Sequence, residues 1–98
     1  MSAYFIALIN IHDAGRYQEY LDGFDEVFAK HRGEVVAVDD QPRVLEGDWP
    51  AGRTVLIRFS NEQMLRSWYE SSDYQHLIEH RQAASTGSIA IVTGRESV

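Results

Sequence analysis

The first apolar run of the chain, residues 4–11, is dominated by β-branched and aromatic side chains on both alternating sets of positions. A strand that is apolar on both faces is typical of the interior of a sheet. Similar short runs at residues 34–38, 54–59 and 89–92 predict three more strands. Residues 44–46 predict a short extended piece that leads into a loop of turn-forming residues.

A helix is predicted between the first two strands, because apolar residues there recur at steps of three and four. Asp13 stands where a helix N-cap belongs, since its carboxylate can accept hydrogen bonds from the free amides of the first turn. A basic stretch followed by Gly33 predicts the end of this helix, with the glycine just after the C-cap. The predicted apolar stripe comprises Tyr17, Tyr20, Leu21, Phe24, Val27 and Phe28.

Two further helices are predicted before the last strand. Ser60 with Gln63, and Ser72 with Gln75, both have the spacing of a capping box, which marks a helix start. The resulting order is strand, helix, strand, strand, broken helix, strand. We therefore predict one α+β domain over residues 1–98, ordered over residues 3–94 and followed by a polar tail that frays. Its predicted fold is ferredoxin-like βαββαβ, a four-stranded antiparallel sheet with helices on one face.

Both faces of this sheet carry apolar residues, which predicts a homodimer. In the first strand the apolar residues at positions 4, 6 and 8 point to one face, and those at 5, 7, 9 and 11 point to the other. The helices have one apolar stripe each and can cover one face only. A second copy of the chain is the simplest cover for the bare face, because soluble monomers rarely expose large apolar patches.

Composition and charge narrow the possible partners. The formal net charge is −6 and the nine Lys and Arg residues are scattered, so neither nucleic acid nor an anionic membrane is an expected partner. The chain has no cysteine, which excludes thiol chemistry and suits a reducing cytoplasm. Residues 4–11 are too few to span a bilayer and lack a signal-peptide cleavage pattern. We therefore expect a cytoplasmic protein.

One motif suggests a metal. His76 and His80, with Glu79 between them, match the H-x-x-E-H pattern of inverted zinc peptidases. Those enzymes need a further carboxylate ligand from a distant helix, and only eighteen residues follow His80. Leu77 and Ile78 belong to the apolar stripe, which turns both histidines to the helix margin. We therefore predict no metal site and no cofactor, and we expect His12 and His31 to be solvated or capping residues.

The loop after the second strand is the leading functional candidate. Residues 46–49 place two carboxylates beside an indole, with a glycine that lets the backbone approach a ligand. The alternative is structural. In that alternative Trp49 plugs the end of the sheet, and Glu46 pairs with Arg43 or Arg53.

Aromatic and arginine side chains at core-facing positions form a second candidate. A cleft between helices and sheet lined by such residues would suit a small aromatic or lactone-like molecule, although core packing is the default for the aromatic rings. Arg58 in an apolar strand and Arg81 on an apolar helix stripe each need a carboxylate, from the chain or from a ligand. The candidate ligand-binding residues are therefore Tyr20, Glu46, Trp49, Arg58, Trp68, Tyr74 and Arg81.

Several of these stretches together resemble the uncharacterised bacterial family called domain of unknown function 1330. They are the Tyr17-x-x-Tyr20 helix, residues 44–50, the Phe59-Ser60 strand end, residues 68–74 and Arg81, and the resemblance extends from Tyr4 to Gly94. It implies the dimeric α/β barrel superfamily, in which two ferredoxin-like sheets pack face to face.

The resemblance brings no established reaction and assigns no catalytic residue. Relatives in the superfamily include cofactor-free monooxygenases, lactone isomerases, haem proteins and simple ligand binders. Three functions stay open, of which we favour a homodimeric small-molecule binding protein. The alternatives are a cofactor-independent enzyme, monooxygenase- or isomerase-like, and a structural or interaction module without a pocket. A titratable group placed beside a bound ligand would favour the enzyme.

Overall fold

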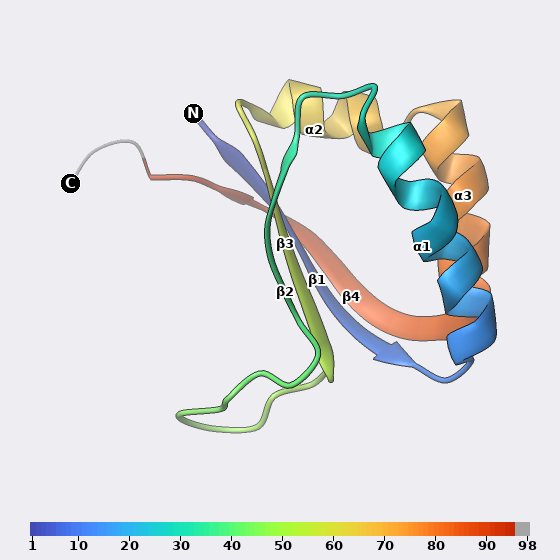
Figure 1. Cartoon of the computed structure of the whole chain (residues 1–98). Coiled ribbons are helices and arrows are strands. Elements are labelled where there is room, and N and C mark those ends of the chain that lie inside the picture. The colour runs from blue at the N-terminus through green and yellow to red at the C-terminus, as the bar shows by residue number, and fades with distance from the viewer. Residues whose placement is uncertain (96–98) are drawn as a thin grey trace.

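The computed structural model describes residues 1–95. The chain order is β1 (Ala3–Ile11), α1 (Ala14–Phe28), β2 (Glu34–Asp39), β3 (Arg53–Phe59), α2 (Glu62–Tyr69), α3 (Ser72–Ala84) and β4 (Ser85–Thr93). The strands form one antiparallel sheet in the order β2-β3-β1-β4, and the helices lie on one face of it (Figure 1). The predicted ferredoxin-like α+β fold is confirmed. The predicted frayed tail includes residues 96–98, which lie outside the described residues.

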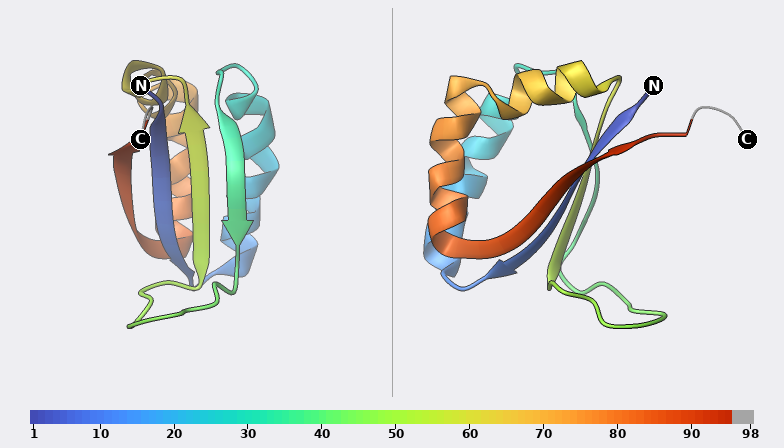
Figure 2. Two further views of the ribbon diagram at one scale, coloured as in Figure 1. Left: turned by 90° about the vertical axis from the view of Figure 1, so that its left-hand side faces the viewer. Right: turned by 180° about the vertical axis from the view of Figure 1, so that it is seen from behind.

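The two central strands are β1 and β3, and Figure 2 shows the whole twisted sheet from its bare side. Strand β4 is longer than the predicted 89–92, because its polar and small first half pairs with the end of β1 through the backbone. Nothing in the apolar pattern marks that half. The extended piece predicted at 44–46 is part of the loop between β2 and β3 and is not a strand.

Helix α1 begins at the predicted cap and ends before the predicted glycine. Asp13 accepts a hydrogen bond from a first-turn amide at 3.0 Å. The helix ends at Phe28 and has Ala29 as its C-cap, so the prediction of Gly33 as the residue closing the helix is wrong. The φ angle of Gly33 is not in the left-handed region. A Cβ there would lie 2.5 Å from the rings of Phe28 and Phe59, so glycine is required for space.

Each of the other two helices has its N-cap one residue away from the predicted one. Asn61, rather than Ser60, caps α2, and its side chain accepts the amide of Met64 at 2.8 Å. Ser71, rather than Ser72, caps α3. Asn and Ser are about equally good N-caps, so neighbouring candidates cannot be separated by residue type alone.

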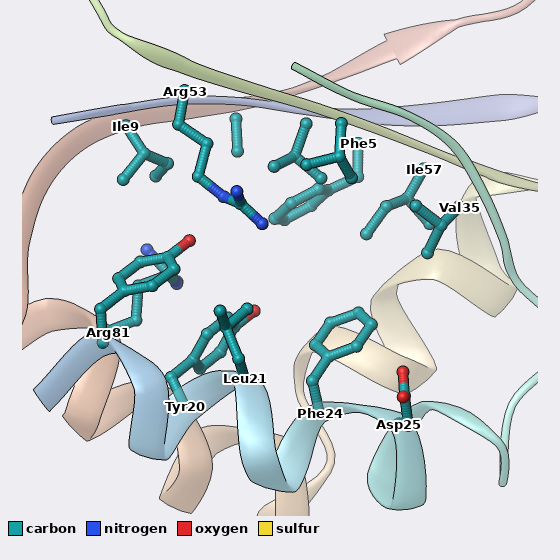
Figure 3. A pocket seen from close by; sticks show the side chains of 14 residues that line it. Phe5, Ile9, Tyr20, Leu21, Phe24, Asp25, Val35, Arg53, Ile57 and Arg81 are labelled. Carbon is teal, nitrogen blue, oxygen red and sulfur yellow. The ribbon is translucent and has the colours of Figure 1, made fainter. Parts of the chain in front are cut away.

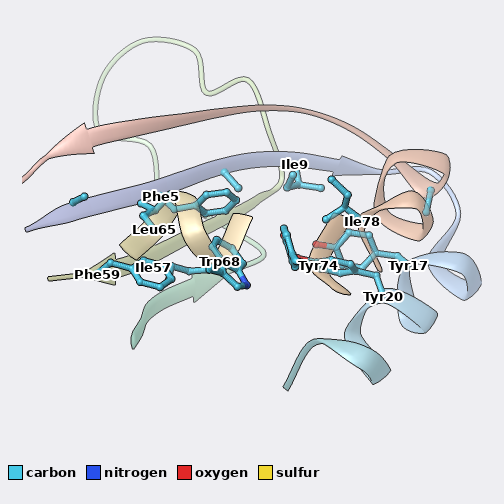
Figure 4. Close-up of a cluster of buried hydrophobic side chains, with 13 residues drawn as sticks. Phe5, Ile9, Tyr17, Tyr20, Ile57, Phe59, Leu65, Trp68, Tyr74 and Ile78 are labelled. Atoms are coloured by element: carbon cyan, nitrogen blue, oxygen red, sulfur yellow. The ribbon is translucent and has the colours of Figure 1, made fainter. Parts of the chain in front are cut away.

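The core is built around Trp68, whose side chain has no exposed surface (Figure 4). Its ring centre lies 5.1 Å from that of Phe5, 5.5 Å from that of Phe59 and 4.3 Å from that of Tyr74. These contacts join α2 and the start of α3 to the two central strands. They fix the helical layer at one end of the sheet.

The two faces of the sheet are divided as the alternation predicts. In β1 the residues at positions 3, 5, 7 and 9 are buried under the helical side, and Tyr4, Ile6 and Leu8 are only partly covered on the bare side. Leu56 of β3 lies beside Ile6, and Ala37 of β2 lies beyond it, so an apolar band crosses the bare face. None of the helices within residues 1–95 is long and apolar enough to cross a membrane.

Candidate functional site

A cavity of about 280 Å³ lies between the sheet and helices α1 and α3 (Figure 3). It exists because α2 packs on the sheet, whereas α1 packs chiefly against α3 and stands away from the strands. Most of its wall is apolar or aromatic, as expected of a small-molecule site. The wall includes Phe5, Ala7, Ile9, Leu21, Phe24 and Ile57.

The mouth of the cavity lies between α1 and the edge strand β2. Val35 and Val38 line the cavity, yet they are 42% and 47% exposed, because no helix packs closely on the edge strand β2. Asp25 is exposed on α1 at the opposite side of the mouth (Figure 3). A ligand can therefore enter past β2 without any movement of the core around Trp68.

Arg81 is the most buried charged residue of the cavity wall, with 7% of its surface exposed. Its Nε and Nη2 atoms are buried and have no hydrogen-bond partner among residues 1–95. Its guanidinium carbon lies 5.8 Å from the centre of the Tyr20 ring, which gives a cation–π contact. Within residues 1–95 Arg81 makes no ion pair, so the internal carboxylate considered for it from the sequence is not there.

Arg53 enters the cavity from the sheet side (Figure 3). Its Nη1 donates to Asp40 Oδ1 at 2.7 Å, and its guanidinium carbon lies 5.6 Å from the centre of the Tyr17 ring. Burial disfavours its charge, but the hydrogen bond to Asp40 and the interaction with Tyr17 outweigh burial and raise the pKa of Arg53. Its buried Nε has no hydrogen-bond partner in the part of the chain that the structure describes.

The hydroxyl groups of Tyr20 and Tyr74 share a buried hydrogen bond of 2.7 Å behind the cavity wall. Burial, together with the neighbouring Tyr74, raises the pKa of Tyr20 well above its usual value. Burial also raises the pKa of Tyr74, although Tyr20 and Arg81 oppose that shift. Both phenols therefore keep their protons at neutral pH. As neutral phenols they can donate or accept hydrogen bonds.

Four of the seven residues predicted from the sequence gather on this side of the sheet. Tyr20 and Arg81 line the cavity. Tyr74 does not line the cavity, but its hydroxyl shares a hydrogen bond with the hydroxyl of Tyr20. Trp68 is a core residue, which is the structural default considered for it.

The candidate residues on the loop, Glu46 and Trp49, lie away from the cavity. The loop between β2 and β3 projects from the end of the sheet, away from the helices (Figures 1 and 2). Trp49 on this loop is 47% exposed and donates to Thr54 Oγ1 at 3.1 Å, so it does not plug the sheet end. Glu46 is exposed as well, and the two arginines considered as its partners pair with Asp39 and Asp40. Neither Glu46 nor Trp49 lines the cavity.

Arg58 is on the bare face of the sheet, where its Nη2 donates to Ser2 Oγ at 2.9 Å. The cavity arginine that sequence reasoning missed is Arg53. A signal for it was available, because positions 53, 55, 57 and 59 share one face of β3, and the last two are buried under the helices. An arginine on that face has to point into the helical side.

The histidines of the zinc-like motif do not come together with further ligands. His76 has 89% of its side chain exposed. His80 accepts a hydrogen bond from Arg16 Nε at its Nδ1, at 2.9 Å. Across residues 1–95 no group of three or more His, Asp or Glu side chains is close enough to hold a metal ion.

Comparison with known proteins confirms the resemblance seen in the sequence. The family model described as "Domain of unknown function (DUF1330)" matches residues 2–95 of the chain. None of the curated proteins matches it.

Several solved structures share the fold at low sequence identity. RPA0582 from Rhodopseudomonas palustris, a protein of unknown function, is 16% identical with a TM-score of 0.79, over 98% of this chain and 84% of its own. SnoaB from Streptomyces nogalater, a cofactor-independent oxygenase, is 16% identical with a TM-score of 0.66, over 99% and 96%. A dimeric ferredoxin-like protein of unknown function from Thermobifida fusca is 11% identical with a TM-score of 0.63, over 94% and 90%.

Proposed function

This chain belongs to the DUF1330 family, and from that premise we propose that it is a homodimeric protein that binds a small organic molecule. The ligand site is the cavity between the sheet and helices α1 and α3. The observation that carries the proposal is an open, mostly apolar cavity of about 280 Å³ with two arginines in its wall. A structural or interaction module does not need a cavity of this kind.

The proposal also includes a homodimer and a cytoplasmic location. The bare face of the sheet carries an apolar band that a second copy would cover, and one relative in fold is described as a dimeric ferredoxin-like protein. Each cavity lies on the helical side within one chain, so two copies would provide two sites. The lack of cysteine suits action in the cytoplasm.

A second candidate function is catalysis on a small organic molecule without a cofactor. SnoaB has the same fold and is described as a cofactor-independent oxygenase. In this chain the observation in favour is the Tyr20 hydroxyl, part of a hydrogen-bonded pair in the cavity wall. However, the pKa values of Tyr20 and Arg53 are both raised, which moves these groups further from acting as bases at neutral pH. Binding is therefore the function that we favour.

A neutral fluorescent probe tests the proposal. N-phenyl-1-naphthylamine should bind saturably, with one site per chain. Val38→Phe places a larger side chain at the cavity mouth and should weaken probe binding at least about tenfold, or ~1.4 kcal/mol. Val44→Phe is the matched control, since Val44 and Val38 are both 47% exposed and Val44 does not line the cavity. Absence of saturable binding, or an equal effect of both substitutions, would overturn the proposal.

A further inference from the structure

The charge inside the cavity is opposite to the charge of the chain. The chain carries a formal net charge of −6. The cavity wall nevertheless holds Arg53 and Arg81, and its one acidic residue, Asp25, is exposed at the mouth. Figure 3 shows Arg81 and Asp25 at opposite ends of the cavity. The interior of the cavity is therefore positive in an acidic protein.

Arg81 is the buried cation of this cavity for which residues 1–95 supply no anion. A buried guanidinium normally lies against an anion, because removing its charge from water is costly. Arg81 has two buried nitrogens without partners and no ion pair within residues 1–95. Its cation–π contact with Tyr20 offsets part of that cost and supplies no negative charge. No carboxylate within residues 1–95 pairs with Arg81, so a bound anion would supply the charge that this site lacks.

Arg53 adds a second positive group that is only partly neutralised. Its Nη1 is bound to Asp40, whereas its Nε has no partner. Asp40 itself does not line the cavity, so this ion pair presents its positive half to a ligand. The planar guanidinium group matches the geometry of a carboxylate better than an ammonium does.

We propose that the ligand is a small organic carboxylate with an apolar or aromatic body, with its carboxylate beside Arg81 and its body against the apolar wall. This inference rests on the proposed function, because it assigns a chemical class to the ligand of the same cavity. Arg53 contributes further attraction from the sheet side. The apolar wall around Phe5, Phe24 and Ile57 contacts the body of the ligand.

The test compares two ligands of nearly equal shape that differ in charge. 2-Naphthoate and 2-naphthamide are each titrated to displace N-phenyl-1-naphthylamine from the intact protein. The parent should bind the carboxylate at least about tenfold more tightly than the amide. Equal affinities, with the probe bound saturably, would overturn the carboxylate inference and leave the proposed function intact. A failure of the probe itself to bind would overturn the proposed function.

Substitutions test whether Arg81 causes the preference for the carboxylate over the amide. Arg81→Gln should lower the preference for the carboxylate over the amide to about threefold, the share that Arg53 supplies. Arg43→Gln is the control, because it removes the same charge from a side chain that is 83% exposed on the loop, and it should keep the preference. An undiminished preference in Arg81→Gln would show that Arg81 is not the anchor. If Arg81→Gln does not fold by circular dichroism, Arg53→Gln takes its place and should reduce the preference of the parent by at least about threefold.

Discussion

The hydroxyl oxygens of Tyr20 on α1 and Tyr74 on α3 lie 2.7 Å apart in a buried hydrogen bond that joins the two helices. Their rings also meet nearly edge to face, with centres 6.3 Å apart. Because α1 stands away from the strands, its position depends on α3, and this pair is one of the links between them. The same pair forms part of the support of the cavity wall.

Removing both hydroxyls should therefore cost less than the two single removals added together. Tyr20→Phe and Tyr74→Phe each leave one buried hydroxyl without its partner, which should lower the free energy of unfolding by about 1–3 kcal/mol. The double variant should lose less than the sum of the two single variants, because no unpaired hydroxyl remains. Urea unfolding of the four proteins measures this difference. Additive losses would show that the two hydroxyls do not interact.

The same pair should make the protein less stable in alkali. The pKa values of Tyr20 and Tyr74 are raised in the folded protein, whereas an unfolded tyrosine keeps its usual value of 10.0. A raised folded pKa contributes stability that is fully present below pH 10 and is lost as the pH rises toward the folded pKa. The loss should be at most about 1.4 kcal/mol per pH unit for each phenol.

Unfolding curves at several pH values between 9 and 11.5 check this slope. The double variant Tyr20→Phe/Tyr74→Phe should lose less stability over that range than the parent. Tyr4→Phe is the control, since it removes a phenol from the bare face of β1, away from the pair. Parallel curves for parent and double variant would contradict the prediction.

The two tryptophans should differ strongly in their contribution to stability. Trp68 has no exposed surface, so Trp68→Ala should cost about 3–5 kcal/mol and can prevent folding altogether. Trp49 is 47% exposed and holds one hydrogen bond, to Thr54, so Trp49→Ala should cost less than about 1 kcal/mol. Thermal unfolding followed by circular dichroism compares them. A large loss in Trp49→Ala would show that the loop packs more tightly than its exposure indicates.

The sequence predicted the fold well because each element carries its own periodic signal. Strands β1 and β3 are short apolar runs rich in β-branched and aromatic residues, and α1 repeats apolar residues at helical spacing. The errors came where that signal is weak. The polar first half of β4 becomes a strand only through pairing with β1, and the caps Asn61 and Ser71 each adjoin an equally suitable residue.

The candidate site was harder to predict, because the cavity depends on how far a helix stands from the sheet. No local sequence pattern predicts the distance between α1 and the sheet. Arg81 was recognised as a charge on an apolar face, and Arg53 could have been recognised in the same way from its position in β3. Glu46 and Trp49 suggested a site by residue type, but the direction in which their loop projects depends on the whole sheet.

The last prediction concerns the dimer and follows from the bare face of the sheet. Ile6 and Leu56 are neighbours on the two central strands, and both are only partly covered in a single chain. They lie near the middle of the apolar band, where a second sheet would pack most closely. Sedimentation equilibrium at micromolar concentration should return about twice the chain mass of 11.2 kDa.

Leu56→Asp would bury a carboxylate without a partner at that interface, so it should shift the protein to monomer. Gln82→Asp introduces the same residue on the exposed surface of α3, and it should leave the dimer unchanged. Since each cavity lies within one chain, a folded Leu56→Asp monomer should still bind N-phenyl-1-naphthylamine. A parent protein that sediments as a folded monomer, or a Leu56→Asp variant that remains dimeric, would show that the bare face is not the interface.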